Sequence, residues 1–159
     1  MILIGLGSNM SGPWGSPTET LDRAVEAIGK NRAQVLARSS WIETKPYGIS
    51  DQPGFVNGAL EIKTSLSPEE LLVMLHEIEI AAGRQRREKW GPRTLDLDII
   101  AYDDVVMAGG DNSLNLTLPH NDLHNRSFVL LPVRELNPSW QHPVSGKTVT
   151  QMLDELAKN

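Results

Sequence analysis

Hydrophobic and polar residues alternate along four short stretches of the chain, a period that is typical of half-buried strands. These stretches have β-branched or aromatic residues at alternating positions, and turn-forming residues bound them. The pattern predicts strands at Ile2–Leu6, Val35–Thr44, Phe55–Lys63 and Leu95–Tyr102.

Three other stretches repeat their apolar residues every three or four positions, as amphipathic helices do. Two of them open with the same signal: a Ser that can cap the free backbone donors, a Pro at the first helical position and a Glu three residues after the Ser. We expect helices from Ser16 to about Gly29, from Ser67 to Gly83 and, on a weaker pattern, from Thr148 to about Ala157.

The resulting order, strand-helix-strand-strand-helix-strand, is that of an α+β ferredoxin-like core, in which helices cover one face of an antiparallel sheet. Residues 103–159 then form a turn-rich C-terminal extension that ends in the last helix. Since the chain has no internal repeat, linker or low-complexity tract, we expect residues 1–159 to form a single domain.

Composition narrows the class of protein. The chain is 40% hydrophobic and 22% charged, and it has no apolar run near the roughly 18 residues that a membrane-spanning helix needs. The apolar amino terminus lacks a basic leader, so we read it as a strand and not as a signal peptide. With no cysteine there is no disulfide or thiol nucleophile, and we expect a cytoplasmic protein.

Charge is unevenly distributed. The net charge of −5 does not suit non-specific nucleic-acid binding. Residues 84–93 nevertheless hold five basic residues against one acidic residue. Arginines bind phosphate oxygens in pairs and stay charged at working pH, so this segment predicts contact with an anion. Taken alone, the same run is also typical of a solvated loop or a nucleic-acid patch.

An acidic pair follows the basic run directly. Asp96 and Asp98 are two positions apart on an expected strand, so both carboxylates point to one face, about 6.5 to 7 Å apart. Mg²⁺ is usually held by one or two carboxylates together with substrate phosphates. The pair next to the basic run therefore favours a metal and polyphosphate site over two ordinary acids on a solvated strand.

Two further groups of residues have candidate chemistry. Phe55 and Asn57 share one face of an expected strand and suit a flat heteroaromatic ring, although an edge aromatic and a turn-stabilising Asn would look the same. His120, Arg126 and Phe128 could contact anions or stack on a ring. The absence of an HExxH pattern and of cysteine argues against zinc.

A glycine-rich segment closes the first strand. Gly5-Leu6-Gly7-Ser8-Asn9 lacks the third glycine of a dinucleotide loop and the Gly-Lys-Ser/Thr of a Walker loop, so any nucleotide site is of another type. We interpret Gly7-Ser8-Asn9 as a tight turn after the strand, and Trp14, Trp41 and Trp140 as packing residues.

Together these segments resemble the 6-hydroxymethyl-7,8-dihydropterin pyrophosphokinases, a family of folate-pathway enzymes. The resemblance covers nearly the whole chain, and its most specific stretch is residues 90–99, Trp-Gly-Pro-Arg-Thr-Leu-Asp-Leu-Asp-Ile. The other segments that carry it are Gly7-Ser8-Asn9, Glu43-Thr44 with Gly48, Gln52-Pro53 with Phe55 and Asn57, Glu79 with Gly83-Arg84-Gln85-Arg86, and Pro119-His120 with Arg126 and Phe128.

The resemblance implies an ATP-dependent diphosphotransferase. Such an enzyme transfers the β,γ-diphosphoryl group of ATP to the hydroxymethyl oxygen of the pterin and releases AMP, a step of folate biosynthesis. The resemblance further implies two Mg²⁺ ions on Asp96 and Asp98, with Arg84 and Arg93 as catalytic phosphate-binding residues. The implied ATP-binding residues are Glu79, Arg86, Trp90, Ile99, His120 and Arg126, and the implied pterin-binding residues are Thr44, Tyr47, Phe55, Asn57 and Phe128.

The expected partners are therefore the two small substrates, with no nucleic acid or membrane, and family analogy implies a monomer. One alternative is a ferredoxin-like nucleic-acid-binding module that uses the basic run with Trp90 and Phe128 for stacking. It leaves the acidic pair unexplained. A catalytically dead pterin-binding relative is the other, and it would require loss of a metal ligand or a phosphate-binding arginine.

Overall fold

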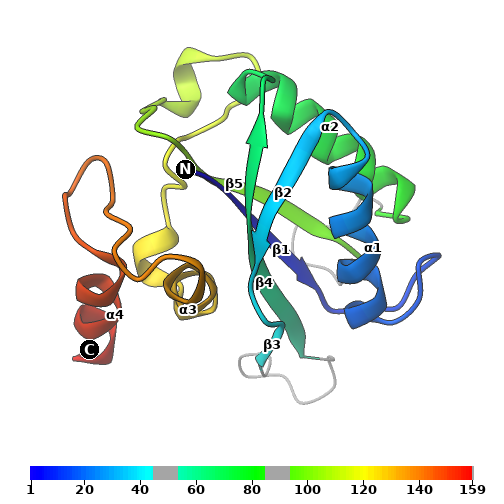
Figure 1. Ribbon diagram of the computed structural model, residues 1–159, viewed down its shortest axis with the longest axis horizontal. Helices are drawn as coiled ribbons and strands as arrows, with labels where there is room; N and C mark the ends of the chain where they lie inside the picture. The colour runs from blue at the N-terminus through cyan, green and yellow to red at the C-terminus, as the bar shows by residue number, and fades with distance from the viewer. Residues whose placement is uncertain (45–53, 85–93, 159) are drawn as a thin grey trace.

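The computed structural model describes residues 1–44, 54–84 and 94–158, and an antiparallel sheet lies at its centre (Figure 1). The strands run in the order β2-β4-β1-β5, and β3 pairs with β4 next to β2. With β2 and β3 taken together, this order confirms the expected ferredoxin-like core. The strands are β1 (Ile2–Ser8), β2 (Ala33–Arg38), β3 (Ile42–Thr44), β4 (Phe55–Thr64) and β5 (Asp96–Tyr102).

The three expected helices are present with the expected caps. The side chains of Ser16, Ser67 and Thr148 each accept a hydrogen bond from the backbone N–H three residues later, and each helix start forms a complete capping box. The helices are α1 (Pro17–Gly29), α2 (Pro68–Ala81) and α4 (Val149–Ala157).

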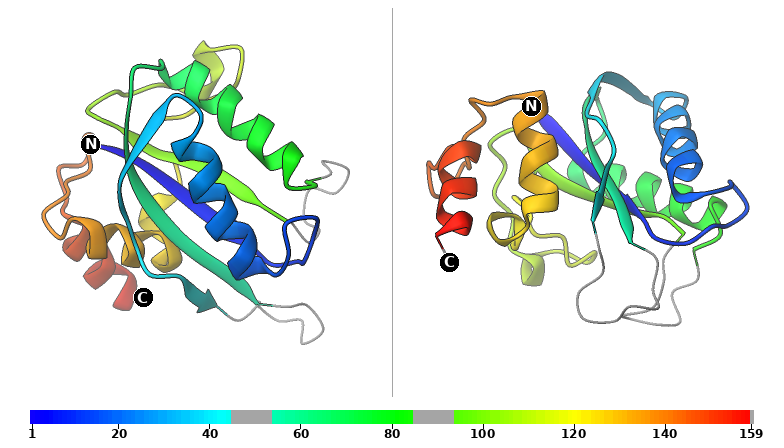
Figure 2. Two further views of the ribbon diagram at one scale, coloured as in Figure 1. Left: turned by 45° about the vertical axis from the view of Figure 1, so that its right-hand side comes forward. Right: turned by 90° about the horizontal axis from the view of Figure 1, so that it is seen from below.

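Helices lie on both sides of the sheet (Figure 2): the two helices of the core cover one face, as expected, and the helices of the C-terminal extension, whose side the sequence left open, lie on the other. Helices α1 and α2 pack on what we call the α1/α2 face, where Ile4, Leu6 and Leu97 join the larger apolar core. A further helix, α3 (Ser127–Leu136), packs on the opposite face, the α3/α4 face, in a second core that includes Leu3 and Ala59, and helix α4 packs on α3. Two 3₁₀ turns, η1 (Gly109–Asp111) and η2 (Leu123–Asn125), precede α3.

Helix α3 was not expected from the sequence. Pro132 lies inside it, and its start at Arg126 has no side-chain cap. Proline removes a backbone donor and is disfavoured in helix interiors, so the local signals argue against a helix here. Burial of Leu130 and Val133 in the α3/α4 core stabilises it instead.

Two other predictions were wrong in detail. The single strand expected at 35–44 is divided into β2 and β3 by Ser39–Trp41. Gly7 and Ser8 do not form a turn, because both are paired within β1, and Asn9 follows as a buried residue. Within the parts of the chain that the structure describes, no helix is both long and apolar enough to cross a membrane.

Candidate active site

The strand register brings a residue with an expected pterin role and a residue with an expected metal role into one row across the sheet. Gly7 on the central strand β1 pairs with Asn57 of β4 on one side and with Asp96 of β5 on the other. Residues directly opposite each other in a sheet share a face, so all three lie on the α3/α4 face. Neighbouring strands are about 4.8 Å apart, which places Asn57 and Asp96 about 10 Å apart with a glycine between them.

A second row, two residues further along each strand, also has a glycine at its centre. Gly5 pairs with Ala59 and with Asp98. Gly7 therefore leaves a floor without a side chain between Asn57 and Asp96, whereas the side chain of Ile100 lies against the Gly5 position. A methyl group built on Gly7 would lie 2.9 Å from Oδ1 of Asn57, so this floor has no room for a side chain unless Asn57 moves.

The shared face of Asp96 and Asp98 is as expected from the sequence. The intervening Leu97 and the flanking Leu95 and Ile99 belong to the core on the α1/α2 face, whereas both aspartates are only partly buried on the other side. Alternation along β5 thus separates packing residues from carboxylates.

The residues at this edge fit a divalent cation that keeps open positions. Within residues 1–44, 54–84 and 94–158, no three His, Cys, Asp or Glu side chains are grouped as a metal site. Among the described residues, the candidate donors at this edge are the two aspartates. Two carboxylates on one face are the protein share of a typical Mg²⁺ site, where water and substrate phosphates supply the remaining oxygen ligands.

Arg84 lies beside these carboxylates. Gly83, with φ +93°, follows the end of α2 in a left-handed conformation, and the Arg84 N–H donates to the Glu79 carbonyl at 3.0 Å. The Arg84 guanidinium Nη1 donates to Oε2 of Glu79 and, at 3.1 Å, to Oδ1 of Asp96. The arginine is therefore held at the Asp96 end of the row Asn57–Gly7–Asp96.

Glu79 connects helix α2 to the edge strand. Its side chain is 1% exposed, and Oε2 accepts the Leu97 backbone N–H at 2.8 Å as well as the bond from Arg84. Burial raises the pKa of Glu79 to about 7, against the opposing effects of the Leu97 N–H and of Arg84. In this structure Glu79 positions Arg84 and β5.

Residues at the other end of the row are joined by polar contacts. Thr44 of β3 pairs with Phe55, and the Asn57 amide Nδ2 donates to Oγ1 of Thr44 at 3.4 Å. Asn57 is 7% exposed and Phe55 is partly buried. Three of the five residues with an expected pterin role are thus adjacent.

His120 and Arg126 lie in the segment that follows β5 in the chain. The His120 N–H donates to the Ile100 carbonyl at 2.9 Å, which places this residue beside β5. Burial, and then the charge of Arg126, lowers the pKa of His120. The Arg126 guanidinium lies 5.7 Å from the ring centre of Phe128, at the start of α3.

Asp122 is a residue that sequence reasoning missed. Its Oδ2 accepts from Nε of Arg126 at 3.1 Å, and its backbone N–H donates to Nδ1 of His120 at 3.3 Å. It thereby orients both of these residues. The four-residue spacing between Asp122 and Arg126 was the available signal.

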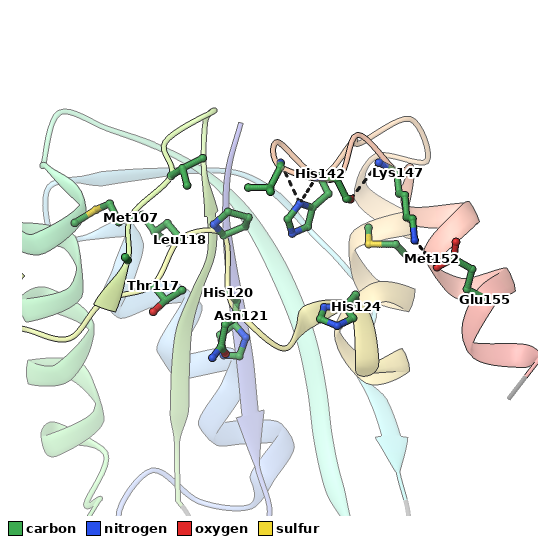
Figure 3. A pocket seen from close by; sticks show the side chains of 15 residues that line it. Met107, Thr117, Leu118, His120, Asn121, His124, His142, Lys147, Met152 and Glu155 are labelled. Carbon is green, nitrogen blue, oxygen red and sulfur yellow. Dashed lines mark hydrogen bonds and ion pairs between the residues drawn. The ribbon is translucent and has the colours of Figure 1, made fainter. Parts of the chain in front are cut away.

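A cavity of about 520 Å³ lies between the His120 segment and the C-terminal segment (Figure 3). His120, His124 and His142 line it together with apolar side chains such as Met107 and Met152. Of the residues in the two glycine rows, none lines this cavity. Among the residues expected to bind ATP, His120 also lines this cavity.

The remaining expected site residues are placed as follows. Ile99 is 2% exposed in the core on the α1/α2 face. Tyr47, Arg86, Trp90 and Arg93 lie outside the described residues.

The fold is a ferredoxin-like α+β core, and two aspartates, an arginine and an Asn–Phe pair lie along one face of its sheet. Residues 3–138 match the model of the 7,8-dihydro-6-hydroxymethylpterin-pyrophosphokinase (HPPK) family, and the chain belongs to this family.

Individual relatives agree with this assignment. The chain is 39% identical over 155 residues to the 2-amino-4-hydroxy-6-hydroxymethyldihydropteridine pyrophosphokinase of Synechocystis sp., covering 97% of this chain and 75% of the relative. It is also 39% identical to the enzyme of the same name from Haemophilus influenzae, covering 97% and 91%. Among solved structures, the wild-type Plasmodium falciparum HPPK-DHPS matches 99% of this chain with a TM-score of 0.72 and 14% identity, and this chain spans 41% of it.

Proposed function

We propose that this chain transfers the diphosphoryl group of ATP to the hydroxymethyl oxygen of 6-hydroxymethyl-7,8-dihydropterin, giving AMP and the pterin diphosphate. The observation that carries the proposal is the row Asn57–Gly7–Asp96, which joins a ring-binding end to a cation-binding end across about 10 Å of glycine floor. A ring held at Asn57 would direct its hydroxymethyl group along this floor toward the phosphates. The family match supports the same reaction.

Asn57, Phe55 and Phe128 would hold the pterin. An amide offers both a donor and an acceptor to a heteroaromatic edge, and phenyl rings stack on its faces. Because Asn57 is almost fully buried and already hydrogen-bonded to Thr44, its amide is fixed before the ring binds. Fixed donors cost little reorganisation at the moment of reaction.

Arg84 would bind the transferred phosphates. Its guanidinium is already oriented toward Asp96 by Glu79, so it can neutralise charge at the place where the attacked phosphorus must lie. Asp96 and Asp98 would hold Mg²⁺, which when bound supplies charge neutralisation and alignment of the phosphate oxygens.

Catalysis by these residues is mainly a matter of alignment. A primary alcohol attacks the β-phosphorus in line, and the proton leaves to water or to another acceptor, because no described side chain is an evident general base. Hydrolysis of ATP is the competing reaction, so exclusion of water from the glycine floor is part of the chemistry.

Several finer assignments belong to the same proposal. They are two Mg²⁺ ions per site; ATP contacts from Glu79, Arg86, Trp90, Ile99, His120 and Arg126; a catalytic role of Arg93; a pterin contact from Tyr47; a monomeric state; and a cytoplasmic location. The side chains of Glu79 and Ile99 are buried, so Glu79 would support the nucleotide through Arg84, and Ile99 would contact it through its backbone.

The test is a chromatographic assay of the purified chain with ATP, the pterin and Mg²⁺. We expect AMP and pterin diphosphate in equal amounts, and neither product without Mg²⁺. Release of ADP, or AMP formation that is independent of the pterin, would contradict the proposed reaction. Addition of single-stranded DNA or RNA should leave the rate unchanged if the basic segment serves phosphates of ATP.

A further inference from the structure

The break between β2 and β3 changes which face of the sheet the following residues occupy. Arg38, the last residue of β2, pairs with Leu60, and Ile42, the first of β3, pairs with Asn57. Three residues, 39–41, therefore lie opposite the two residues Gly58 and Ala59. This is a β-bulge, in which one strand has one residue more than its partner.

The extra residue inverts the alternation of side chains. Arg38 is opposite Leu60, whose side chain belongs to the core on the α1/α2 face. Thr44 is six positions later and would share that face in an uninterrupted strand, because the side-chain period is two. It is instead opposite Phe55 and within hydrogen-bonding distance of Asn57, on the α3/α4 face.

Each of the three residues in the bulge is fixed by a different part of the fold. Ser39 is 2% exposed and bonds to β4: its N–H donates to the Ala59 carbonyl, and its hydroxyl accepts the Ala59 N–H, both at 2.9 Å. Ser40 bonds to α3, because its N–H and hydroxyl both donate to the Glu135 carboxylate, at 2.8 to 3.1 Å.

Trp41 bonds to α1, on the other side of the sheet. Its indole N–H donates to Oδ1 of Asp22 at 2.9 Å, and Arg38 both donates to that oxygen at 3.2 Å and lies 4.2 Å above the indole ring. The ring also covers Gly58 so closely that a methyl group built there would lie 2.2 Å from Cε3 of Trp41.

We propose that the bulge at residues 39–41, held from opposite faces of the sheet by Asp22 and Glu135, positions Thr44 and thereby the Asn57 amide for the pterin. Asp22 and Glu135 are positioning residues: they act through Trp41 and Ser40 and lie on helices of the two opposite layers. This inference rests on the proposed pterin role of Thr44, Phe55 and Asn57.

The test compares Asp22→Ala, Glu135→Ala and the double variant with matched controls on the same helices. Glu26→Ala on α1 and Arg134→Ala on α3 remove exposed charges next to, but outside, the anchoring contacts. Dissociation constants for the pterin and for a non-hydrolysable ATP analogue are measured separately by calorimetry. Circular dichroism confirms that each variant is folded.

We expect pterin affinity to fall about threefold in each single variant and about tenfold in the double variant, as for loss of exposed charge-assisted hydrogen bonds. Affinity for the ATP analogue should stay unchanged, and so should both affinities in the controls. Asp22→Asn should lie between wild type and Asp22→Ala, because an amide oxygen can still accept the Trp41 N–H.

Phe55→Ala separates failure of this inference from failure of the proposed function. If Phe55→Ala weakens pterin binding and the folded double variant does not, the positioning role is wrong and the site stands. Equal losses for pterin and ATP analogue in the double variant would also overturn the positioning role, since they indicate general loosening. If Phe55→Ala has no effect on pterin binding, the assignment of the ring site itself fails.

Discussion

The two faces of the sheet differ in the side chains that the same strands present to them. On the α1/α2 face, alternate residues of β1 and β5 such as Ile4, Leu6 and Leu97 are large, apolar and buried. On the opposite face, the residues between them include Gly5, Gly7, Asp96 and Asp98. The same strands therefore present a packing surface to one side and a row of glycines and carboxylates to the other.

The difference shows how stability and function are separated in this fold. Burial on the α1/α2 face is uniform and needs only apolar side chains of the right size. On the other face, apolar residues such as Leu3 and Ala59 pack beneath α3. Changes to neighbouring residues of one strand should thus have opposite consequences, one for activity and the other for stability.

The largest effect on activity is expected for Asp98→Asn. Removing one carboxylate charge from the cation-binding end should lower the turnover rate by about a hundredfold to a thousandfold. The unfolding temperature should change little, because the side chain is only partly buried. Turnover and thermal unfolding are measured on the same preparation, and near-normal Mg²⁺-dependent rates would refute the role of Asp98.

The neighbouring Leu97→Ala should show the reverse pattern. Leu97 is 2% exposed, and its truncation should lower the free energy of unfolding by about 2 to 5 kcal/mol. The folded fraction should retain most of its turnover at low temperature. Urea denaturation gives the stability, and Leu97→Met, which conserves volume, serves as the control. A large loss of turnover without a loss of stability would contradict the separation of the two faces.

A smaller effect is expected for Gly7→Ala. The new methyl group would lie 2.9 Å from Oδ1 of Asn57, so either the amide or the backbone of β1 must shift. Pterin affinity should fall about tenfold, which corresponds to about 1.4 kcal/mol. Calorimetry with the pterin measures this, and Gly110→Ala is a suitable control because a methyl group there meets nothing within 4 Å. Unchanged pterin binding would mean that the ring does not approach this row.

The smallest effect concerns the pH dependence of stability, away from the two faces. Burial, and then the charge of His124, lowers the pKa of His142, whose Nδ1 accepts the Val144 and Ser145 N–H groups. A lowered pKa in the folded state means that the unfolded chain binds the proton more readily. This contribution to stability is present above pH about 6.5, the usual value for histidine, and is lost as the pH falls below it.

Denaturation of wild type and His142→Asn across pH 5 to 7.5 tests this point. The variant keeps an acceptor but not the titrating group, so its stability should fall less steeply toward acid. His120 has a pKa shift of the same sign and contributes equally to both proteins. Parallel curves for the two proteins would show that His142 does not contribute to the slope.

The sequence predicted those parts of the fold that local chemistry determines. The capping boxes at Ser16, Ser67 and Thr148 fixed the starts of three helices, and alternation placed Asp96 and Asp98 on one face. Helix α3 could not be predicted, because tertiary burial around Leu130 outweighs the interior proline.

The candidate site was predictable as a set of residues and not as an arrangement. Phe55, Asn57 and the two aspartates were recognised from their spacing, but the row that joins them through Gly7 depends on strand register. The bulge at residues 39–41 depends on contacts with Asp22 and Glu135, which lie 19 and 95 positions away from their partners. Such long-range contacts leave no local pattern in the sequence.

The most direct test of the central claim is a crystal structure of the chain with Mg²⁺, the pterin and a non-hydrolysable ATP analogue. We expect the pterin ring at Asn57 and Phe55, and the triphosphate with its cations at Asp96, Asp98 and Arg84, with Gly7 between the two. A pterin or triphosphate bound elsewhere, for example in the cavity lined by His120, His124 and His142, would contradict this claim.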